Sequence, residues 1–249
     1  MSGQPPDATL DQQRVYYNRF WTDRATAPDS QEVLRLAKIL EGCSTVMDHL
    51  SPPGRMPRIC DLGCGRGWLS AELARFGAVT GVDLSTEGIR LAAERWPHVS
   101  FVAADILAWR VSEPFDLVVS SEVIEHIPDK ARFVGTVDAI VRPGGYVIIT
   151  TPTQRAKRAY FARGFEPQMI EEWLSPGELR QLLSPRFAVL RHETFLFDFA
   201  NSGIYRLANS TKLKKLFDLI GLRHLYNGIR QTAGLGLYQI LIAQKRPTY

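Results

Sequence analysis

The chain is poor in cysteine and has no long uninterrupted apolar run. Its 249 residues include three cysteines, Cys43, Cys60 and Cys64, whose spacing fits no common metal-binding motif. A membrane-spanning helix needs roughly 18 consecutive apolar residues, and no stretch of the sequence reaches that length. The first residues, MSGQPPDATL, lack the basic and apolar regions of a secretion signal. We therefore expect a disulfide-free protein located in the cytoplasm.

Neither sign of charge is in large excess. The chain has 30 Lys and Arg against 26 Asp and Glu, a formal net charge of +4. This balance permits contact with nucleic acid or anionic lipid but does not require it. A basic cluster at residues 155–163 has no recognised RNA-binding module beside it. We therefore expect no nucleic-acid partner.

The order of predicted elements indicates an α/β fold. Residues 11–50 are expected to be helical, with Val15, Leu34, Leu36, Ile39, Leu40 and Val46 available for an apolar stripe. A linker at 51–57 is rich in proline and glycine, and short β-branched runs then alternate with helical patterns. This alternation is typical of a mostly parallel sheet. The expected strands are 58–62, 78–83, 99–105, 115–121 and 146–151, with the clearest helices at 68–76 and 86–95.

The last third of the sequence predicts two more strands separated by an insertion. A helix is expected at 176–183 with Ser175 as its N-cap, followed by strands at 187–195 and 237–245. The segment 197–234 between those strands is too long for a hairpin turn, so it predicts an inserted helical element. We therefore divide the chain into a helical cap or lid at 1–50 and one domain at 51–249.

A glycine-rich loop comes directly after the first predicted strand. In ICDLGCGRGWL the strand ends at Asp61, and Gly63, Gly65 and Gly67 precede a helix. A side chain at such positions would block a ligand from the backbone. The G-x-G-x-G spacing differs from the G-x-G-x-x-G of dinucleotide-binding loops, which hold a pyrophosphate. Asp61 would instead attract a positively charged cofactor.

Two further acids end the next two predicted strands. Asp83 lies about 20 residues beyond the glycines, where a carboxylate reaches ribose hydroxyls. Asp105 is followed by apolar Ile106, a pair suited to an adenine amine and ring. Each acid alone is commonly a helix N-cap. The carboxyl ends of parallel strands form one rim, so three acids there predict a cofactor site.

The successive motifs DLGCGRG, GVDLS, AADI, FDLVVSSEVIEHIPD and VRPGGYVIITTP resemble those of class I S-adenosylmethionine-dependent methyltransferases. Within that superfamily, residues 55–195 most resemble the small-molecule O-methyltransferases of ubiquinone biosynthesis. The resemblance implies a Rossmann-like fold with a seven-stranded, mostly parallel sheet, an antiparallel last strand and helices on both faces. It also implies a small-molecule acceptor, most simply a hydroxyl group in a biosynthetic pathway.

The same resemblance assigns roles to the residues of the rim. It places Asp61 and Gly63 at the methionine end of S-adenosylmethionine, Asp83 and Leu84 at the ribose, Asp105 and Ile106 at the adenine, and Ser121 and Glu122 beside the sulfonium. Gly65 belongs to the same cofactor loop.

Glu125 and His126 come next in SEVIEHIPD and leave three alternatives open. Some relatives with E-x-x-E-H bind a divalent metal, but they usually supply a further histidine downstream, where this chain has Glu171 and Glu172. That departure argues against a metal. His126 could instead be the general base that deprotonates a hydroxyl acceptor, with Glu125 beside it. In the third alternative both residues only fix the loop.

Two segments outside the motifs are candidates for acceptor or surface contacts. RVYYNRFWTDR offers Tyr16, Tyr17, Phe20 and Trp21 as a lid over the cavity, or as simple packing. The stretch 211–230 mixes basic and apolar side chains, a pattern typical of membrane-surface helices and also of cap helices with a solvated face.

Three other functions compete with small-molecule methylation. An RNA 2′-O-methyltransferase shares the EVIEH motif but needs the missing histidine. A non-catalytic cofactor-binding scaffold would keep the three acids without turnover. An NAD-dependent oxidoreductase fits neither the glycine spacing nor Asp105. The sequence does not fix the acceptor or the oligomeric state.

Overall fold

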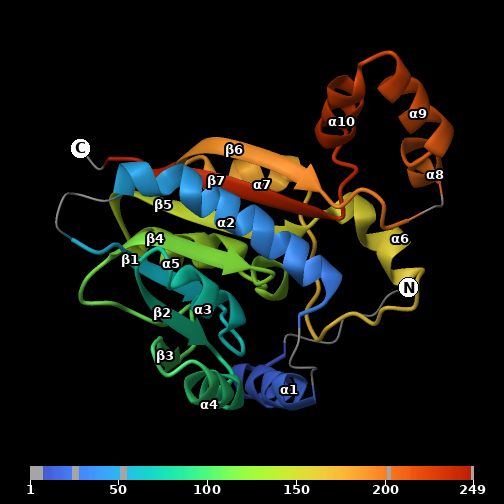
Figure 1. The fold of residues 1–249 in the computed structure, drawn as a ribbon. Helices are drawn as coiled ribbons and strands as arrows, with labels where there is room; N and C mark the ends of the chain where they lie inside the picture. The colour runs from blue at the N-terminus through green and yellow to red at the C-terminus, as the bar shows by residue number, and fades with distance from the viewer. Residues whose placement is uncertain (1–7, 24–27, 51–54, 201–202, 248–249) are drawn as a thin grey trace.

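The protein forms one seven-stranded sheet covered by helices on both faces, as Figure 1 shows for the computed structural model. The structure describes residues 8–23, 28–50, 55–200 and 203–247. The strand order is β3-β2-β1-β4-β5-β7-β6. The strands are β1 (Arg58–Leu62), β2 (Ala78–Asp83), β3 (Ser100–Ala103), β4 (Phe115–Ser121), β5 (Val141–Pro152), β6 (Phe187–Phe195) and β7 (Tyr238–Lys245).

Six strands run in one direction and the last runs against them. β1 pairs in parallel with β2 and β4, β2 with β3, and β4 with β5. β7 pairs antiparallel with both β5 and β6. The carboxyl ends of β1 to β5 therefore share one edge, where open α/β sheets bind ligands. This arrangement confirms the predicted fold class.

Helices cover the sheet and extend past it. They are α1 (Leu10–Asp23), α2 (Ser30–Leu50), α3 (Trp68–Leu73), α4 (Thr86–Arg95), α5 (Lys130–Ile140), α6 (Lys157–Phe161), α7 (Pro176–Leu183), α8 (Ile204–Ala208), α9 (Thr211–Leu219) and α10 (Arg223–Thr232), with 3-10 turns at Ile124–His126 and Gln154–Ala156. Among the described residues, none of these helices combines the length and apolar character needed to cross a bilayer. Figure 1 shows α8 to α10 projecting from one end of the sheet.

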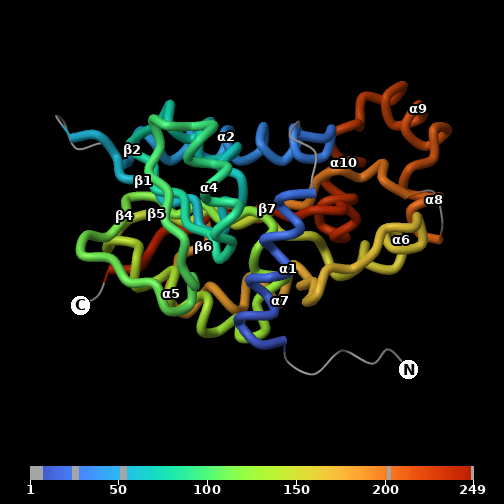
Figure 2. Tube along the Cα trace, turned by 90° about the horizontal axis from the view of Figure 1, so that it is seen from below, coloured from blue at the N-terminus to red at the C-terminus, as the bar shows by residue number. Residues whose placement is uncertain are grey.

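The predicted helical segment at the N-terminus is two helices with different roles. α2 lies on the sheet and buries Ile39 and Val46 in the main core. Gly42 lets it approach closely, because a Cβ there would come 2.9 Å from Cδ1 of Ile242. α1 instead packs beside α4, and Figure 2 shows it crossing the molecule at a steep angle to α2. Val15 of the predicted apolar stripe is therefore 70% exposed on α1, and Leu34 is 37% exposed on α2.

Two predicted elements end earlier than expected. The helix expected to reach Phe76 ends at Leu73. The Ala74 backbone N–H donates the last helical hydrogen bond to the Ser70 carbonyl, and the Phe76 N–H donates to the Leu73 carbonyl in a turn. The strand expected at 99–105 is Ser100–Ala103, since the Asp105 carboxylate accepts a hydrogen bond from the Leu107 backbone and turns the chain. Asp105 thus lies just beyond the strand, still at the rim.

Candidate active site

The loop after β1 requires glycine for its backbone and for its close packing. Gly63, Gly65 and Gly67 have φ values of 86°, 52° and 73°, in the left-handed region that favours glycine. A Cβ on Gly63 would overlap Cγ2 of Val123, and one on Gly67 would come 2.5 Å from Cζ of Phe101. Residues with side chains would therefore not fit at these positions between β1 and α3.

The acids at the ends of β1 and β2 are fixed by neighbouring donors. Asp61 is buried and accepts a hydrogen bond of 2.6 Å from Oγ of Ser70. The Asp83 carboxylate accepts from the backbone N–H groups of Gly65 and Ser85, both at 2.8 Å. Asp83 thus ties the glycine loop to the start of α4 and holds the rim in shape.

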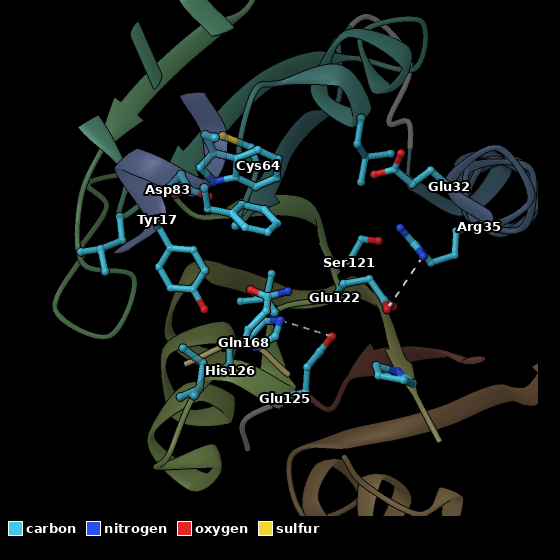
Figure 3. A pocket seen from close by; sticks show the side chains of 18 of the residues that line it. Tyr17, Glu32, Arg35, Cys64, Asp83, Ser121, Glu122, Glu125, His126 and Gln168 are labelled. Carbon is cyan, nitrogen blue, oxygen red and sulfur yellow. Dashed lines mark ion pairs between the residues drawn. The ribbon is translucent and has the colours of Figure 1, made fainter. Parts of the chain in front are cut away.

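A cavity of about 680 Å³ opens at this edge of the sheet. Its lining residues come from three parts of the chain: the first half, residues 152–173, and β7. Of the residues predicted from the sequence, its walls include Asp61, Gly63, Asp83, Leu84, Asp105, Ile106, Ser121, Glu122, Glu125, His126, Tyr17, Phe20 and Trp21. Figure 3 shows Asp83 and Tyr17 on one side and Glu122, Glu125 and His126 on the other.

Gly65 and the predicted lid meet directly. A Cβ on Gly65 would overlap Cζ2 of Trp21, so the indole ring lies on the glycine loop. Asn18 fastens α1 to α4, because its Oδ1 accepts from Oγ of Ser85 at 2.8 Å and from the Glu87 backbone at 3.2 Å. Tyr16 faces a separate small hollow with Phe20. Three of the four predicted lid residues therefore face the cavity.

Burial raises the pKa of four carboxyl groups that line the cavity. Burial raises the pKa of Asp61 to about 7, and that of Glu122 and of Glu125 to about 8 each. Burial also raises the pKa of Asp83. A cation in the cavity would favour the ionised forms of all four groups. The site is thus suited to a positively charged ligand.

Glu122 is held in a strained conformation at the end of β4. Its φ is 59°, which is costly for a residue with a side chain. The backbone donates a hydrogen bond of 3.0 Å to the Thr150 carbonyl, and Oε1 accepts one of 3.2 Å from the Thr150 hydroxyl. These contacts with β5 direct the Glu122 carboxyl group into the cavity (Figure 3). Strain of this kind is commonly found at functional positions.

His126 is positioned with one ring nitrogen committed. Nδ1 lies 2.7 Å from the Ile170 carbonyl, and because a carbonyl only accepts, Nδ1 carries the proton. Nε2 is then the acceptor atom, 3.8 Å from Oε1 of Glu125. Glu125 is buried and its Oε2 accepts a hydrogen bond of 2.9 Å from the Thr151 hydroxyl. The arrangement leaves Nε2 available to receive a proton.

The acids that replace the expected downstream histidine have structural partners. The Glu171 carboxylate accepts hydrogen bonds from the Trp173 indole and from the Gln168 backbone. Glu172 pairs with Lys130 at 2.6 Å. Within the described residues, no three His, Cys, Asp or Glu side chains are grouped so that they could hold a metal ion. Glu171 and Glu172 are thus engaged by partners within the chain.

Arg35 and an aromatic wall were not predicted from the sequence. Arg35 of α2 lies 3.9 Å from Oε2 of Glu122 and 4.7 Å above the Tyr238 ring, and its Nε is buried without a hydrogen-bond partner within the described structure. Tyr160 and Trp173, with ring centroids 5.3 Å apart, line the same end of the cavity. No local motif marks these residues, which come from three distant parts of the chain.

The sheet topology and the acid-lined rim define a Rossmann-like enzyme class that binds its cofactor at the carboxyl ends of the strands. The model of one family, described as a methyltransferase domain, matches residues 30–227. The chain belongs to this methyltransferase family. The match confirms the predicted class of S-adenosylmethionine-dependent methyltransferases.

Curated relatives are similar over about half of this chain. A ubiquinone biosynthesis O-methyltransferase of Caulobacter sp. (strain K31) is 34% identical over 145 residues, which are 53% of this chain and 57% of that protein. The protein of the same name from Ralstonia nicotianae is 41% identical over 107 residues, 40% of this chain and 45% of its own. The chain thus spans about half the length of the curated relatives it matches.

Solved structures share the fold at low identity. The N-methyltransferase NodS from Bradyrhizobium japonicum WM9, in complex with S-adenosyl-L-homocysteine, has a TM-score of 0.58 at 16% identity, covering 94% of this chain and 100% of that one. The [4+2]-cyclase SpnF has a TM-score of 0.62 at 18% identity, covering 100% of both chains. At such identities the likeness shows the fold alone.

Proposed function

We propose that the protein transfers a methyl group from S-adenosylmethionine to a hydroxyl group of a small-molecule acceptor in a biosynthetic pathway. One observation carries the proposal: four carboxyl groups withdrawn from bulk solvent, those of Asp61, Asp83, Glu122 and Glu125, face a single cavity. A sulfonium cofactor is positively charged, whereas the pyrophosphate of NAD would be repelled there. The names of the curated relatives favour oxygen as the methylated atom.

The rim residues supply complementary contacts for each part of the cofactor. Asp83 and Leu84 would hold the ribose, and Asp105 and Ile106 the adenine. Asp61, the Gly63 backbone and Arg35 would hold the methionine end, because a guanidinium with a buried, unused Nε suits its carboxylate. Ser121 and Glu122 would lie beside the sulfonium. When bound, the cofactor supplies an electrophilic methyl group.

The other side of the cavity would hold the acceptor. A hydroxyl group loses its proton as its oxygen attacks, and Nε2 of His126 is the atom that would receive it. Glu125 lies beside this nitrogen and would stabilise the imidazolium. Tyr17, whose hydroxyl points toward Gln168 and His126 in Figure 3, would close the acceptor side. The remaining work is alignment and exclusion of water, which α1 performs as a lid.

The experiment is a transfer assay with methyl-labelled S-adenosylmethionine and chelator-treated protein. The acceptor panel pairs substituted phenols and catechols with their O-methyl ethers and with the matching anilines. We expect label in the hydroxyl compounds and none in the ethers. Label only in amines, or only in short RNA with free 3′ ends, would contradict the proposal. Cofactor binding with no transfer to any acceptor would support a non-catalytic scaffold instead.

A further inference from the structure

The helices α8 to α10 carry an apolar surface that the other described residues leave uncovered. Among the described residues, fifteen large apolar side chains are exposed, and eight of these lie between Ile204 and Ile229. Leu219 is 85% exposed and Leu207 is 67% exposed. Leu222, Leu225 and Ile229 are spaced by three and four, so they share one face of α10. Large exposed apolar patches commonly mark sites of contact with a protein or a membrane.

The opposite face of the same helices is packed. Phe217 and Tyr226 pack with ring centroids 5.1 Å apart, and Tyr205 packs on Phe199 at 4.7 Å. Arg230 is buried, donates to Asp198 and Asn209, and stacks 4.3 Å from the Phe197 ring. Tyr205 also belongs to the main core, and the Thr194 hydroxyl of β6 donates to the Gln231 carbonyl of α10 at 3.4 Å, so the helices are anchored to the body and their outer apolar face is held outward. Figures 1 and 2 show the three helices at the edge of the molecule beside α6.

The charge around this face is predominantly positive. Residues 203–232 contain six Lys and Arg residues and one acid, Asp218. Asp218 pairs with Arg223 at 2.6 Å, and Lys214 pairs with Asp198 at 2.5 Å. Arg206, Lys212 and Lys215 are exposed beside the apolar side chains. A partner for this surface must therefore be negatively charged around an apolar interior.

We infer that α8 to α10 form a docking surface for an anionic lipid bilayer. A bilayer of this kind offers both features at once: acidic headgroups for Arg206, Lys212 and Lys215, and an acyl region for leucines such as Leu219 and Leu225. A second copy of the chain would bring the same positive charges together. The inference concerns a surface outside the cavity and goes beyond the proposed function.

Vesicle sedimentation with the full chain tests the inference. The probes are vesicles of phosphatidylcholine alone and vesicles of phosphatidylcholine mixed with phosphatidylglycerol. We expect binding to the mixed vesicles that weakens with salt, and little binding to the neutral ones. Neutralising two charges with Lys212→Gln and Lys215→Gln should weaken partitioning about 30-fold. Replacing Leu219 and Leu225 together by serine should weaken it about tenfold or more.

Leu190→Ser is the matched control, because Leu190 is 57% exposed but lies on β6. This variant should bind like the unchanged protein. Equal binding to both kinds of vesicle, or variants that bind as well as the control, would overturn the inference. Light scattering that shows a dimer dispersed by the Leu219 and Leu225 changes, with no vesicle binding, would assign the face to a second copy. The assay needs neither cofactor nor acceptor, so its failure leaves the proposed function untouched.

Discussion

The proposed acceptor side of the cavity contains one imidazole, His126, whose tautomer is set by a backbone carbonyl. Nδ1 of His126 donates to the Ile170 carbonyl, so Nε2 is the proton acceptor. This contact joins a residue after β4 to the segment before α7. The two segments are far apart in the sequence, and no motif predicts that they meet. The proposed base is therefore positioned by a loop rather than by its own helical turn.

His126→Ala should lower kcat about 100-fold or more while changing the dissociation constant of S-adenosylmethionine little, because general-base catalysis contributes roughly 10² to 10⁴. Single-turnover kinetics and calorimetry measure the two quantities. His126→Asn is the control, since its amide nitrogen takes the place of Nδ1 and can still donate to the Ile170 carbonyl but cannot take the proton. Full turnover in the asparagine variant would reduce His126 to a positioning residue.

The raised pKa of Glu122 predicts that the preference for S-adenosylmethionine over S-adenosylhomocysteine depends on pH. Its pKa is raised to about 8 by burial, so the carboxyl group is neutral in acid and becomes an attractive anion as the pH rises through that value. Only S-adenosylmethionine carries the sulfonium charge, whereas S-adenosylhomocysteine shares every other group. The affinity ratio of the two should therefore increase from pH 6 to pH 9, as measured by calorimetry at each pH.

Glu122→Gln should flatten this profile in part, leaving the contribution of Asp61, whose pKa is raised to about 7. A control at Glu113, a surface carboxylate with a side chain 70% exposed, should leave the profile unchanged. A ratio that is constant with pH in the unchanged protein would mean that the carboxyl groups of the cavity do not face the sulfonium.

At the scale of elements, the proposed lid α1 is attached to α4 and to the glycine loop. Asn18 caps the start of α4 from outside, and Trp21 covers Gly65. Deleting residues 1–24 should raise the acceptor KM about tenfold or more, since the acceptor side would open to water. Asn18→Ala should raise it less. Arg19→Ala is the control, because that side chain is 86% exposed on the same helix. Unaltered acceptor affinity after the deletion would contradict the lid.

Arg230 joins separate segments of the insertion to one another, because its partners Asp198 and Asn209 lie before and after α8. Replacing Arg230 with methionine removes hydrogen bonds to Asp198 and Asn209 and should cost about 2–3 kcal/mol of local stability. Hydrogen exchange should then accelerate in α9 and α10 and not in the sheet. Arg223→Met breaks an exposed pair and should cost less than about 1 kcal/mol. Equal protection in the two variants would show that apolar packing alone holds the insertion.

At the scale of the whole molecule, the sequence predicted the features that depend on strand direction. Asp61, Asp83 and Asp105 could be placed on one rim because parallel strands end at the same edge. Arg35, Tyr160 and Tyr238 could not, since they meet only after α2 lies on the sheet and β7 inserts between β5 and β6. Periodicity also failed for α1, whose Val15 is exposed because the helix contacts α4 rather than the core. The acids at the strand ends are thus predictable from local sequence, whereas Arg35 and the aromatic residues of the cavity depend on tertiary contacts.

The fold alone does not settle the reaction. A cyclase and an N-methyltransferase are both similar to this chain in structure, so the reaction depends on the residues of the cavity rather than on the fold. Those residues are the buried carboxyl groups and His126. The central claim is that the cavity selects a sulfonium cofactor.

Calorimetric titration of chelator-treated protein with S-adenosylmethionine and, separately, with NAD tests that claim most directly. We expect binding of S-adenosylmethionine with one site per chain and no heat from NAD, with or without added magnesium. Binding of NAD, or S-adenosylmethionine binding that requires magnesium, would contradict the claim.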